Sequence, residues 1–482
     1  MGTPATATII PLGAIHTETD FTFQSKFDIT NFNCTDSGNA LLFARLWGNK
    51  VRYDHTANEW YTFEGHTWKK VQGGKIDRLM LEATNKRLEH SVKIQDQDQR
   101  QRHAKWALNS ESDYLIKASL NRAKKVKPID FSRDQFDRDP FLLGCRNGII
   151  NLRNGKLLHG TPDHLISKST GINFDPQATC PRWERFLDEV FEGNNDLINF
   201  IQLAIGYSLT GDVSEQKFFA LYGSGANGKS TFLTVMTNLL GDYIGNAAAE
   251  TFILNKFNND GSNNVADLFG KRFVTYSELR ENSRWNEARL KMLSGGDVVT
   301  ARQLYQKNFT FKPAFKIWFS FNHKPSTSDN SDAFWRRVCL VPFKRKFSID
   351  NKLEGILLNE LPGILTWGVG GCLAWQQERQ KEGQTEGGLC IPNIVKSEVK
   401  AYQKENNTIN QFFDENVTME KSAKTEAAVL YQRYKTWCEA NGEYTLTHKK
   451  LGTKLNEMNI ESDRFFENGK QSLFYIGLKL NE

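Results

Sequence analysis

The feature that most constrains the fold is the octapeptide Gly223-Ser-Gly-Ala-Asn-Gly-Lys-Ser230. It matches the phosphate-loop pattern G-x-x-x-x-G-K-[ST] at every fixed position. The apolar run 218–222 before it predicts a buried strand, and residues 231–240 after it carry the spacing of a helix that ends at Gly241. A strand, a glycine loop and a helix in this order form the context in which the motif binds phosphate. We therefore expect an α/β P-loop core that binds a nucleoside triphosphate.

Every position of this octapeptide suits a phosphate-binding loop. Small residues let the backbone curl so that several N–H groups point into one cavity, where the helix N-terminus adds partial positive charge. Lys229 supplies a full charge for the phosphates of ATP, and the Ser230 hydroxyl is placed for Mg²⁺. The alternative, a glycine-rich turn without function, is disfavoured because motif, lysine and context occur together. The predicted nucleotide-binding residues are Gly223, Gly225, Ala226, Asn227, Gly228, Lys229, Ser230 and Thr231.

Two further strands end in polar side chains that a triphosphatase needs. Residues 271–278 predict a strand ending at Glu278, a candidate to activate the attacking water and to contact Mg²⁺. Ser277 stands where many such enzymes have an aspartate, which leaves the outer contact to Mg²⁺ open. Residues 316–322 predict a third strand ending at Asn322, whose amide can hold the lytic water. A strand ending in a surface glutamate is common in isolation, so these assignments depend on the glycine loop upstream.

Two adjacent arginines, Arg336 and Arg337, precede a predicted strand at 339–343. An arginine offered to the γ-phosphate of a neighbouring subunit stabilises the charge of the transition state, so both are candidate catalytic residues. An arginine pair alone means little. Its place after the glycine loop and the two polar-ended strands supports the assignment.

An inserted β-hairpin is predicted between Glu278 and Asn322. Residues 298–305 and 309–312 alternate in polarity on both sides of Gln306-Lys-Asn308. The basic residues on its arms and at its tip are Arg302, Lys307 and Lys312. Basic and aromatic residues together suit a nucleic-acid backbone and the bases beside it, which makes these three candidate DNA contacts.

Length and composition set wider limits. A chain of 482 residues predicts about three domains, and its net charge of +6 permits a nucleic-acid partner without demanding one. The 7 cysteines contain no C-x-x-C pair, which favours reduced thiols in the cytoplasm over a zinc ribbon. The first residues lack the pattern of a signal peptide, and no apolar run reaches the ~18 residues of a membrane span.

The N-terminal third predicts a small α+β domain. Residues 1 to about 34 are expected to form a flexible arm. The expected helices and strands that follow are 39–47, 51–54, 59–63, 66–68, 76–89, 112–123, a hairpin over 141–152 turning at Asn147-Gly148, and helices 181–191 and 196–205. The aromatic residues of the strands favour a small sheet over base stacking, and the basic cluster 122–127 favours a solvated face over a DNA contact. The last two helices are expected to form a collar before the glycine loop.

The C-terminal part predicts helices over 353–377 and 394–404 with a glycine-rich break at 383–388. Helices at 424–440 and 447–458 and a hairpin of 464–470 with 472–478 then suggest a winged-helix-like domain. Its second helix would offer basic side chains to DNA, namely Lys449, Lys450 and Lys454. A small capping domain with a solvated basic face is an equal alternative.

Taken together, the motifs resemble those of superfamily 3 helicases. The series Gly-x-Gly-Ala-Asn-Gly-Lys-Ser, Tyr-Ser-Glu, Gly-Gly-Asp-x-x-x-x-Arg-x-x-Tyr, Phe-x-Phe-Asn and Trp-Arg-Arg is similar, more narrowly, to the phage and plasmid primase-helicase family, which shares its ATPase with the poxvirus primase-helicase. Residues 35–40, Asn147-Gly148 and 179–183 look like that family's pre-helicase domain. The resemblance covers about 35 to 345.

The resemblance implies an AAA+-like ATPase in a ring-shaped hexamer, with ATP between subunits and hairpins that grip one DNA strand. It implies that Lys229 and Ser230 bind nucleotide and Mg²⁺ and that Glu278 activates water. Asn322 becomes sensor 1, Arg336 or Arg337 the trans finger, and Lys307 the DNA contact at the hairpin tip. Translocation would run 3′ to 5′. Many members carry a primase domain before this region, and only about 34 residues precede it here, so a separate primase or polymerase is an expected partner.

We therefore expect five segments and one function. The segments are a flexible arm at 1–34, a pre-helicase domain at 35–180, the ATPase core at 181–345, a helical lid at 346–420 and a winged-helix-like domain at 421–482. The function is that of an ATP-driven DNA helicase that replicates a phage, plasmid or other mobile element on single-stranded or forked DNA. Two alternatives are an origin-binding initiator and a ring ATPase that is not a helicase.

Overall fold

The computed structural model describes residues 27–248, 251–254, 265–277, 283–302, 308–327, 331–348, 350–381, 387–406, 408–442, 445–467 and 470–481. Contacts divide the chain into two compact units. The first comprises 1–62 with 69–133, and the second comprises 63–68 with 134–482. Residues 134–180, expected in the N-terminal domain, therefore group with the glycine loop. Each unit is described by itself.

The first unit is mainly helical. Its elements and those at its boundary are η1 Ile29–Asn31, α1 Asp36–Trp47, β1 Val51–Asp54, β2 Glu59–Glu64, β3 Thr67–Lys70, α2 Lys75–Ser91, α3 Gln97–Asn109, α4 Asp113–Ala123 and β4 Asp130–Phe131. β1 pairs antiparallel with β2, as the sequence predicts, and parallel with β4, which it does not predict. Helix α3 is likewise not predicted by the sequence. Its few apolar residues give a weak helical period, so Asp96, whose side chain accepts a hydrogen bond from Gln99 N at 2.7 Å, is the clearer signal.

The expected flexible arm is too long by several residues. Residues 1–26 lie outside the described residues, but Ile29 is buried beside Leu42 and Ile94. The buried Arg87 donates through Nη1 to Phe32 O at 2.7 Å. The segment after residue 26 is thus part of the folded first unit, because its Ile29 side chain is buried and its backbone accepts a hydrogen bond from Arg87.

The second unit begins with a small antiparallel sheet and two helices. These elements are η2 Arg133–Gln135, β5 Leu142–Cys145, β6 Gly148–Asn151, β7 Lys156–Leu158, η3 Pro162–His164, α5 Pro181–Phe191 and α6 Asn195–Leu209. The predicted hairpin forms, but Cys145 pairs with Gly148, so the turn is Arg146-Asn147, one residue before the expected place.

A parallel five-stranded sheet carries the glycine loop. Its order is β14-β8-β13-β10-β9, and every neighbouring pair is parallel. The strands are β8 Phe218–Tyr222, β9 Ile244–Asn246, β10 Phe273–Ser277, β13 Lys316–Phe321 and β14 Val338–Pro342, and helix α7 Lys229–Leu240 with η4 Gly241–Tyr243 connects β8 to β9. Because the strands run the same way, all of them start at one edge, here called the amino edge, and end at the other, the carboxyl edge.

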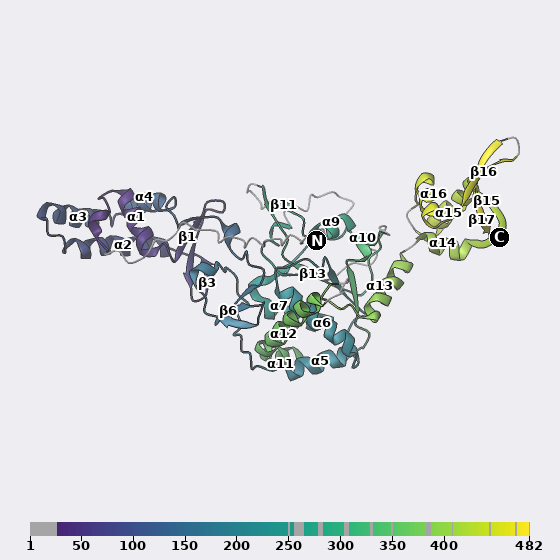
Figure 1. The fold of residues 1–482 in the computed structure, drawn as a ribbon, viewed down its shortest axis with the longest axis horizontal. Coiled ribbons are helices and arrows are strands. Elements are labelled where there is room, and N and C mark those ends of the chain that lie inside the picture. The colour runs from purple at the N-terminus through teal and green to yellow at the C-terminus, as the bar shows by residue number, and fades with distance from the viewer. Residues whose placement is uncertain are drawn as a thin grey trace, which may run out of the picture. The chain divides into compact units, whose positions relative to one another are not determined.

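Two cores cover the two faces of this sheet. Since side chains alternate along a strand, Phe219 and Leu221 of β8 pack on one face and Phe218 and Ala220 on the other. Figure 1 shows the helices α5, α6, α7, α11 (Leu353–Asn359) and α12 (Leu361–Gln380) gathered on the first face, where their apolar residues join one cluster. Helices α5 and α6 therefore share the core of the sheet and do not form a separate collar.

The second face carries the inserted hairpin. Its elements are α9 Glu287–Gly295, β11 Val299–Arg302, β12 Asn308–Phe311 and α10 Asp332–Trp335. β11 and β12 pair antiparallel, from Val299 opposite Phe311 to Arg302 opposite Asn308, which confirms a hairpin in this segment. Asn308, expected in the turn, instead lies in β12, so the expected place of the turn is wrong. Val299, Ala301 and Phe311 are buried, and each such side chain stabilises the fold by about 1–3 kcal/mol. The hairpin is therefore anchored by its inward residues.

Two buried cations fix the amino edge of the sheet. Lys316 Nζ, at the start of β13, donates to Thr210 O at 2.5 Å and Asp212 O at 3.0 Å. Arg272 Nη1, just before β10, donates to Leu209 O at 2.6 Å. The carbonyls of Leu209 and Thr210 lie at the C-terminus of α6, where the helix dipole is negative. The cations thus bind the sheet to the loop 210–217.

Helix α12 lies along α6 in the first core. A Cβ on Gly206 would lie 2.1 Å from Cys372 N, and one on Gly371 would lie 2.2 Å from Gln202 O, so two glycines permit this approach. No single helix within the described residues is long and apolar enough to cross a bilayer, and α11 with α12 reaches that length only across a 68° bend. Helix α13 Asn393–Glu405 then packs against β14.

The C-terminal residues form a third core of their own. The elements are α14 Thr408–Asn416, β15 Val417–Glu426, α15 Ala427–Asn441, α16 His448–Glu457, β16 Ser462–Glu467 and β17 Lys470–Leu480, with antiparallel order β15-β17-β16. The expectation of a helix from residue 424 is wrong, because 424–426 pair with 474–476 as the end of β15. Both later helices and the hairpin of β16 with β17 follow the prediction.

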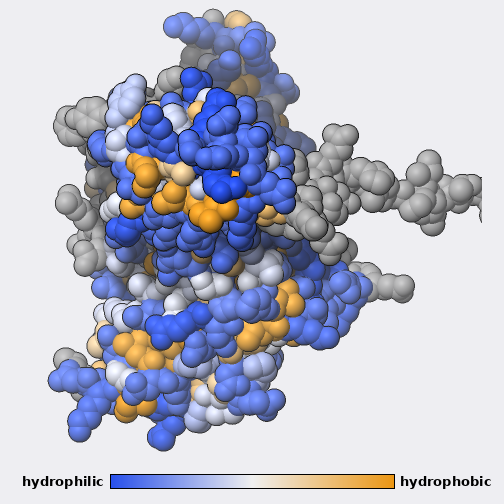
Figure 2. Space-filling view, turned by 90° about the vertical axis from the view of Figure 1, so that its left-hand side faces the viewer, coloured by the Kyte–Doolittle hydropathy of each residue, from blue (hydrophilic) through white to orange (hydrophobic). Residues whose placement is uncertain are grey.

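The face in Figure 2 is mostly hydrophilic, with hydrophobic residues in small separate groups. The exposed large hydrophobic side chains come from many elements and include Val92, Tyr114, Val298 and Phe466. Small apolar groups of this kind are ordinary at protein surfaces, so they carry no functional assignment.

Candidate nucleotide site

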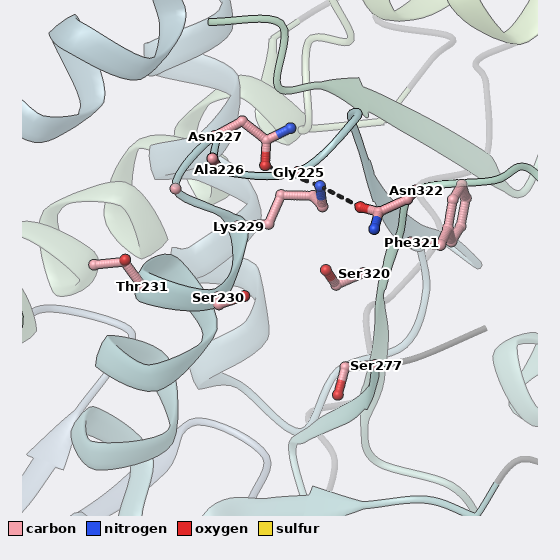
Figure 3. A pocket seen from close by; sticks show the side chains of 11 residues that line it. Gly225, Ala226, Asn227, Lys229, Ser230, Thr231, Ser277, Ser320, Phe321 and Asn322 are labelled. Atoms are coloured by element: carbon pink, nitrogen blue, oxygen red, sulfur yellow. Dashed lines mark hydrogen bonds between the residues drawn. The ribbon is translucent and has the colours of Figure 1, made fainter. Parts of the chain in front are cut away.

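The glycine loop joins β8 to α7 at the carboxyl edge of the sheet. Its backbone enters the left-handed region at Gly225 (φ +97°), Ala226 (φ +52°) and Gly228 (φ +86°), where glycine is favoured over other residues. A cavity of about 380 Å³ lies against the loop. It is lined by residues 225–231 together with Ser277, Ser320, Phe321 and Asn322, most of which Figure 3 labels. Successive N–H groups in such a turn form an anion-binding concavity.

The segment after β14 holds the loop in this shape. Asn227 Nδ2 donates to Phe343 O at 2.9 Å, and Phe347 N donates to Ala226 O at 2.8 Å. A Cβ on Gly223 would lie 2.1 Å from Phe343 O, so the first glycine of the motif is required for this close approach. The sequence predicted Asn227 as a cofactor contact, whereas its amide here also binds the loop to the chain beyond β14.

Lys229 is the central group of the cavity. Its side chain is 4% exposed, and Nζ donates to Gly223 O at 2.7 Å, Asn227 Oδ1 at 2.9 Å and Asn322 Oδ1 at 3.1 Å. Figure 3 shows the ammonium between the two asparagines. None of these acceptors is a carboxylate, and burial lowers the pKa of Lys229 to about 8. An anion placed beside this nitrogen would restore the charged form, so the chemistry fits a phosphate.

Two neighbouring strands end in polar side chains that line the same cavity as Lys229. Asn322 follows β13, and Ser277 at the end of β10 pairs with Ser320 in β13. Figure 3 shows the side chains of Ser230, Ser277 and Ser320 around the same cavity, with Thr231 on the far side of α7. Glu278 lies outside the described residues, so the structure gives no position for it. Ser320 is not among the site residues predicted from the sequence, although its two-residue spacing from Asn322 places both side chains on the same side of the strand.

The described residues contain no cluster of three or more His, Cys, Asp or Glu that would bind a metal by themselves. A Mg²⁺ brought by phosphates would find the exposed Ser230 hydroxyl in the cavity wall, with the hydroxyls of Ser277 and Ser320 on the strands beside it. This donor set fits a metal that keeps most of its water and phosphate ligands. Among the described lining residues there is no carboxylate to replace the aspartate expected at Ser277.

The two arginines lie at the opposite edge of the sheet. Val338 pairs with Phe218 at the start of β8, so Arg337 and Arg336 lie beyond the amino edge, while the glycine loop follows the end of β8. A strand of this length separates the two positions by roughly 17 Å at about 3.3 Å per residue. Arg336 is exposed, whereas Arg337 is 8% exposed and donates to Ala333 O. The structure therefore does not bring either arginine to the loop of its own chain.

The predicted DNA contacts fall in two places. Arg302 and Lys312 are exposed near the ends of β11 and β12, and Lys307 lies outside the described residues. Lys449 and Lys450 are exposed on α16, while Lys454 is half-buried. The structure thus groups these residues by element, with one set on the hairpin and one on the C-terminal helix.

Three family models match consecutive parts of the chain. A D5 N-terminal-like family matches residues 40–192, and a family of unknown function (DUF5906) matches residues 221–337. A poxvirus D5 protein-like family matches residues 404–479. The second match contains the glycine loop, the hairpin and both arginines, and the third contains the C-terminal sheet.

Two viral proteins are among the relatives. A provisionally named helicase, L207/L206, of Acanthamoeba polyphaga mimivirus is 26% identical over 422 residues, which are 79% of this chain and 43% of the relative. A provisionally named primase, C962R, of African swine fever virus is 25% identical over 328 residues, which are 63% of this chain and 34% of the relative. The chain thus spans less than half the length of either relative.

A solved structure, the apo NrS-1 C-terminal region, resembles the chain with a TM-score of 0.50 at 11% identity. The likeness covers 92% of this chain and 99% of that chain. At this identity it concerns the fold alone.

The fold and site define a mixed α/β protein with a glycine loop at the carboxyl edge of a parallel sheet. The matches to D5-type families at both ends, together with viral relatives named for helicase and primase roles, place the chain more narrowly. It resembles the phage and viral primase-helicase family. The sequence resemblance to that family is thereby confirmed.

Proposed function

We propose that this protein is an ATP-driven DNA helicase that acts in the replication of a virus, phage or other mobile element. The observation that carries the proposal is Lys229, a buried cation whose acceptors among the described residues are all neutral oxygens, in a cavity lined by a phosphate-loop motif. The helicase and primase names of the relatives support the link to replication.

Binding of a triphosphate would exchange the partners of Lys229. All three of its N–H groups are used by Gly223, Asn227 and Asn322, so the β- and γ-phosphates must displace one acceptor. Asn322 is the acceptor best placed to leave, because it is exposed and has the longest of the three bonds. Once released, its amide can orient the water that attacks the γ-phosphate. Glu278 would accept the proton of that water, and Ser230 would help to hold a Mg²⁺, which would supply positive charge against the phosphates.

The position of the arginines favours a ring. Arg336 is exposed at the amino edge, far from the loop of its own chain, so it can serve a phosphate only in a neighbouring subunit. In an assembly of this kind the arginine neutralises transition-state charge in trans, which is worth about 10³–10⁵ in rate. We propose an AAA+-like core that assembles as a hexamer and moves 3′ to 5′ along single-stranded DNA.

The hairpin and the C-terminal domain would contact DNA. Arg302 and Lys312 on the hairpin suit backbone phosphates, and Lys307 belongs to the same proposal. The order α14, β15, α15, α16, β16, β17 with a sheet ordered β15-β17-β16 supports a winged helix, in which α16 would present Lys449, Lys450 and Lys454 to a groove.

A forked-duplex unwinding assay beside an ATPase assay tests this proposal. Glu278→Gln should bind nucleotide yet hydrolyse it very slowly, since an amide cannot accept the proton of water. The triple variant Arg302→Ala, Lys307→Ala, Lys312→Ala should keep DNA-independent ATPase and lose unwinding. A matched control removes the exposed lysines Lys346, Lys352 and Lys421. Wild-type unwinding by the hairpin variant would contradict the assignment of the hairpin as the translocating element.

An origin-binding initiator is the second candidate, favoured by the exposed lysines of α16. It would bind one duplex sequence tightly and melt it, without unwinding plain forks. Loss of site-specific binding in Lys449→Ala, Lys450→Ala, with unwinding of plain forks absent in the wild type, would favour this function.

A further inference from the structure

Gln216 joins the arginines to the hairpin at the amino edge of the sheet. Its Oε1 accepts from Arg336 Nη2 at 2.9 Å and from Arg337 Nη2 at 3.3 Å. Its Nε2 donates to Gly295 O at 3.3 Å. Gly295 is the last residue of α9, and the hairpin strand β11 begins at Val299. One carboxamide therefore binds both arginines and the element that leads into the hairpin.

The loop that carries Gln216 is held firmly. Gln216 itself has a φ of +54°, and its N–H donates to Val213 O at 3.0 Å, closing a tight turn. On one side of it, Lys316 binds Thr210 O and Asp212 O. The next residue along, Lys217, donates through Nζ to Arg336 O at 2.6 Å. Because these hydrogen bonds hold the loop, the Gln216 side chain keeps a fixed position between its partners.

A neutral amide is suited to hold two adjacent arginines. Arg337 lies close to Arg336, and burial together with that neighbouring charge lowers the pKa of Arg337. Asp297, after α9, partly offsets this effect on Arg337. An amide oxygen accepts from both guanidinium groups without forming an ion pair, so the charge of Arg336 stays available for a phosphate. A carboxylate in the same place would hold the arginines and neutralise them.

The other end of the amide depends on the hairpin. The bond to Gly295 O is 3.3 Å long, so a small shift of the end of α9 breaks it. Val299 and Ala301 of β11 lie in the same buried cluster as Leu290 and Leu293 of α9, so a displacement of the hairpin can be transmitted to α9. A displacement there would change how Gln216 holds Arg336.

We propose that Gln216 is a positioning residue that presents Arg336 to the γ-phosphate of a neighbouring subunit and couples this presentation to the DNA-contacting hairpin. The proposal rests on the proposed function, since it requires a ring in which Arg336 acts in trans. It assigns to Gln216 the stimulation of ATP hydrolysis by single-stranded DNA. DNA binding at the hairpin shifts α9, and the amide transmits this shift to the arginine.

Two substitutions of Gln216 test the roles of its amide oxygen and its amide nitrogen separately. Gln216→Met removes all three hydrogen bonds, and we expect the ATPase of the assembled protein to fall by about 10- to 100-fold, as for a misplaced catalytic group. Gln216→Glu keeps acceptors for the arginines and loses the donor to Gly295 O. Its basal ATPase should lie below that of the wild type, because the carboxylate pairs with the arginines, and it should not respond to single-stranded DNA. Ser214→Ala, an exposed change on the same loop, is the matched control and should behave as wild type.

Mixing of subunits distinguishes positioning from a structural role. Lys229→Ala subunits have an intact Arg336 and Gln216 but no functional loop, while Gln216→Met subunits have an intact loop. Their mixture should recover ATPase, as should the reference mixture of Arg336→Ala with Lys229→Ala, because each contains hybrid interfaces with both parts intact.

The outcomes of the mixing experiment are separable. If the reference mixture recovers and the Gln216→Met mixture does not, Gln216 acts within its own subunit and the inference is overturned while the proposed function stands. If neither mixture recovers although exchange of subunits is confirmed, Arg336 does not act in trans and both proposals fail. A Gln216→Glu variant that responds to DNA as wild type does would also overturn the coupling.

Discussion

The two edges of the parallel sheet each hold a buried lysine, in opposite ways. At the carboxyl edge, Lys229 is held by two side-chain amides and one carbonyl, and the cavity beside it is open to a ligand. At the amino edge, Lys316 is held by the carbonyls of Thr210 and Asp212 and lies 4.6 Å from the centre of the Tyr207 ring. Side-chain acceptors can move aside for a phosphate, whereas backbone carbonyls cannot. The comparison teaches that burial of a cation marks a site only when its partners can be exchanged.

Burial lowers the pKa of both lysines, and for Lys316 it lowers the value well below the usual range. Arg272 adds to the effect on Lys316, and Asp212 opposes it. The pKa alone therefore does not separate Lys229, the proposed nucleotide-binding lysine, from Lys316, which holds the fold. The hydrogen-bond acceptors of the two lysines do separate them, because those of Lys229 are mostly side chains and those of Lys316 are backbone carbonyls.

The largest effect is expected for Lys229→Ala. We expect nucleotide binding and hydrolysis to be abolished, because the phosphates lose the only full charge of the loop. Thermal unfolding without nucleotide should change little, since removal of a buried cation also removes its desolvation cost. Binding by titration calorimetry and melting by circular dichroism check this. Retained nucleotide binding would remove Lys229 from the site.

Replacing the two arginines one at a time should have different effects, one on ATP hydrolysis and the other on stability. Arg336→Ala should lower ATPase of the assembled protein by about 10³-fold with little change in melting temperature, because its side chain is exposed. Arg337→Ala should lower the melting temperature, because its buried guanidinium binds Ala333 O and Gln216 and fills space in the fold. Steady-state ATPase and thermal melting on the same preparations distinguish them. The reverse pattern would make Arg337 the finger.

For Lys316→Ala we expect the opposite of Lys229→Ala. A buried and a partly buried carbonyl lose their donor and a cavity forms, which should destabilise the protein by about 2–4 kcal/mol. Nucleotide affinity of the folded fraction should stay within about 3-fold, since Lys316 lies at the far edge of the sheet. Urea unfolding and calorimetry measure the two quantities. A strong loss of affinity with unchanged stability would reverse the roles of the lysines.

The smallest effect is a pH dependence at Lys229. Its pKa of about 8 in the free protein lies below the usual 10.5, and a bound phosphate raises it. Nucleotide binding therefore takes up a proton above pH 8, and affinity should fall by up to about 10-fold per pH unit there. Between pH 8 and 10.5 the unfolded chain binds more protons at this lysine than the folded one, so its contribution to stability rises with pH.

The two trends of Lys229 thus have opposite signs over the same range. Titration calorimetry with an ATP analogue at pH 7, 8 and 9 measures how the affinity changes with pH. The rise of stability with pH should be absent from Lys229→Ala. Affinity that stays constant from pH 7 to 9 would mean that the lysine is already charged in the free protein.

The sequence by itself determined the carboxyl edge of the sheet. Strands β8, β10 and β13 and helix α7 follow from local apolar spacing, and the loop shape follows from glycines at the positive φ of Gly225 and Gly228. These features depend on neighbours a few residues apart, so a motif records them. The hairpin of β11 and β12 was predictable for the same reason.

Only the tertiary structure decided which polar groups meet across long distances in the chain. Gln216 and Arg336 are 120 residues apart, and nothing in the local pattern of Gln216 distinguishes it from a surface glutamine. The same holds for the packing of residues 27–34, for β15, whose polar strand is identified by its pairing with β17, and for α5 and α6, whose apolar faces match the sheet. Strand pairing, burial and shared acceptors are properties of the folded chain, because they arise from residues that the sequence separates and the fold brings together.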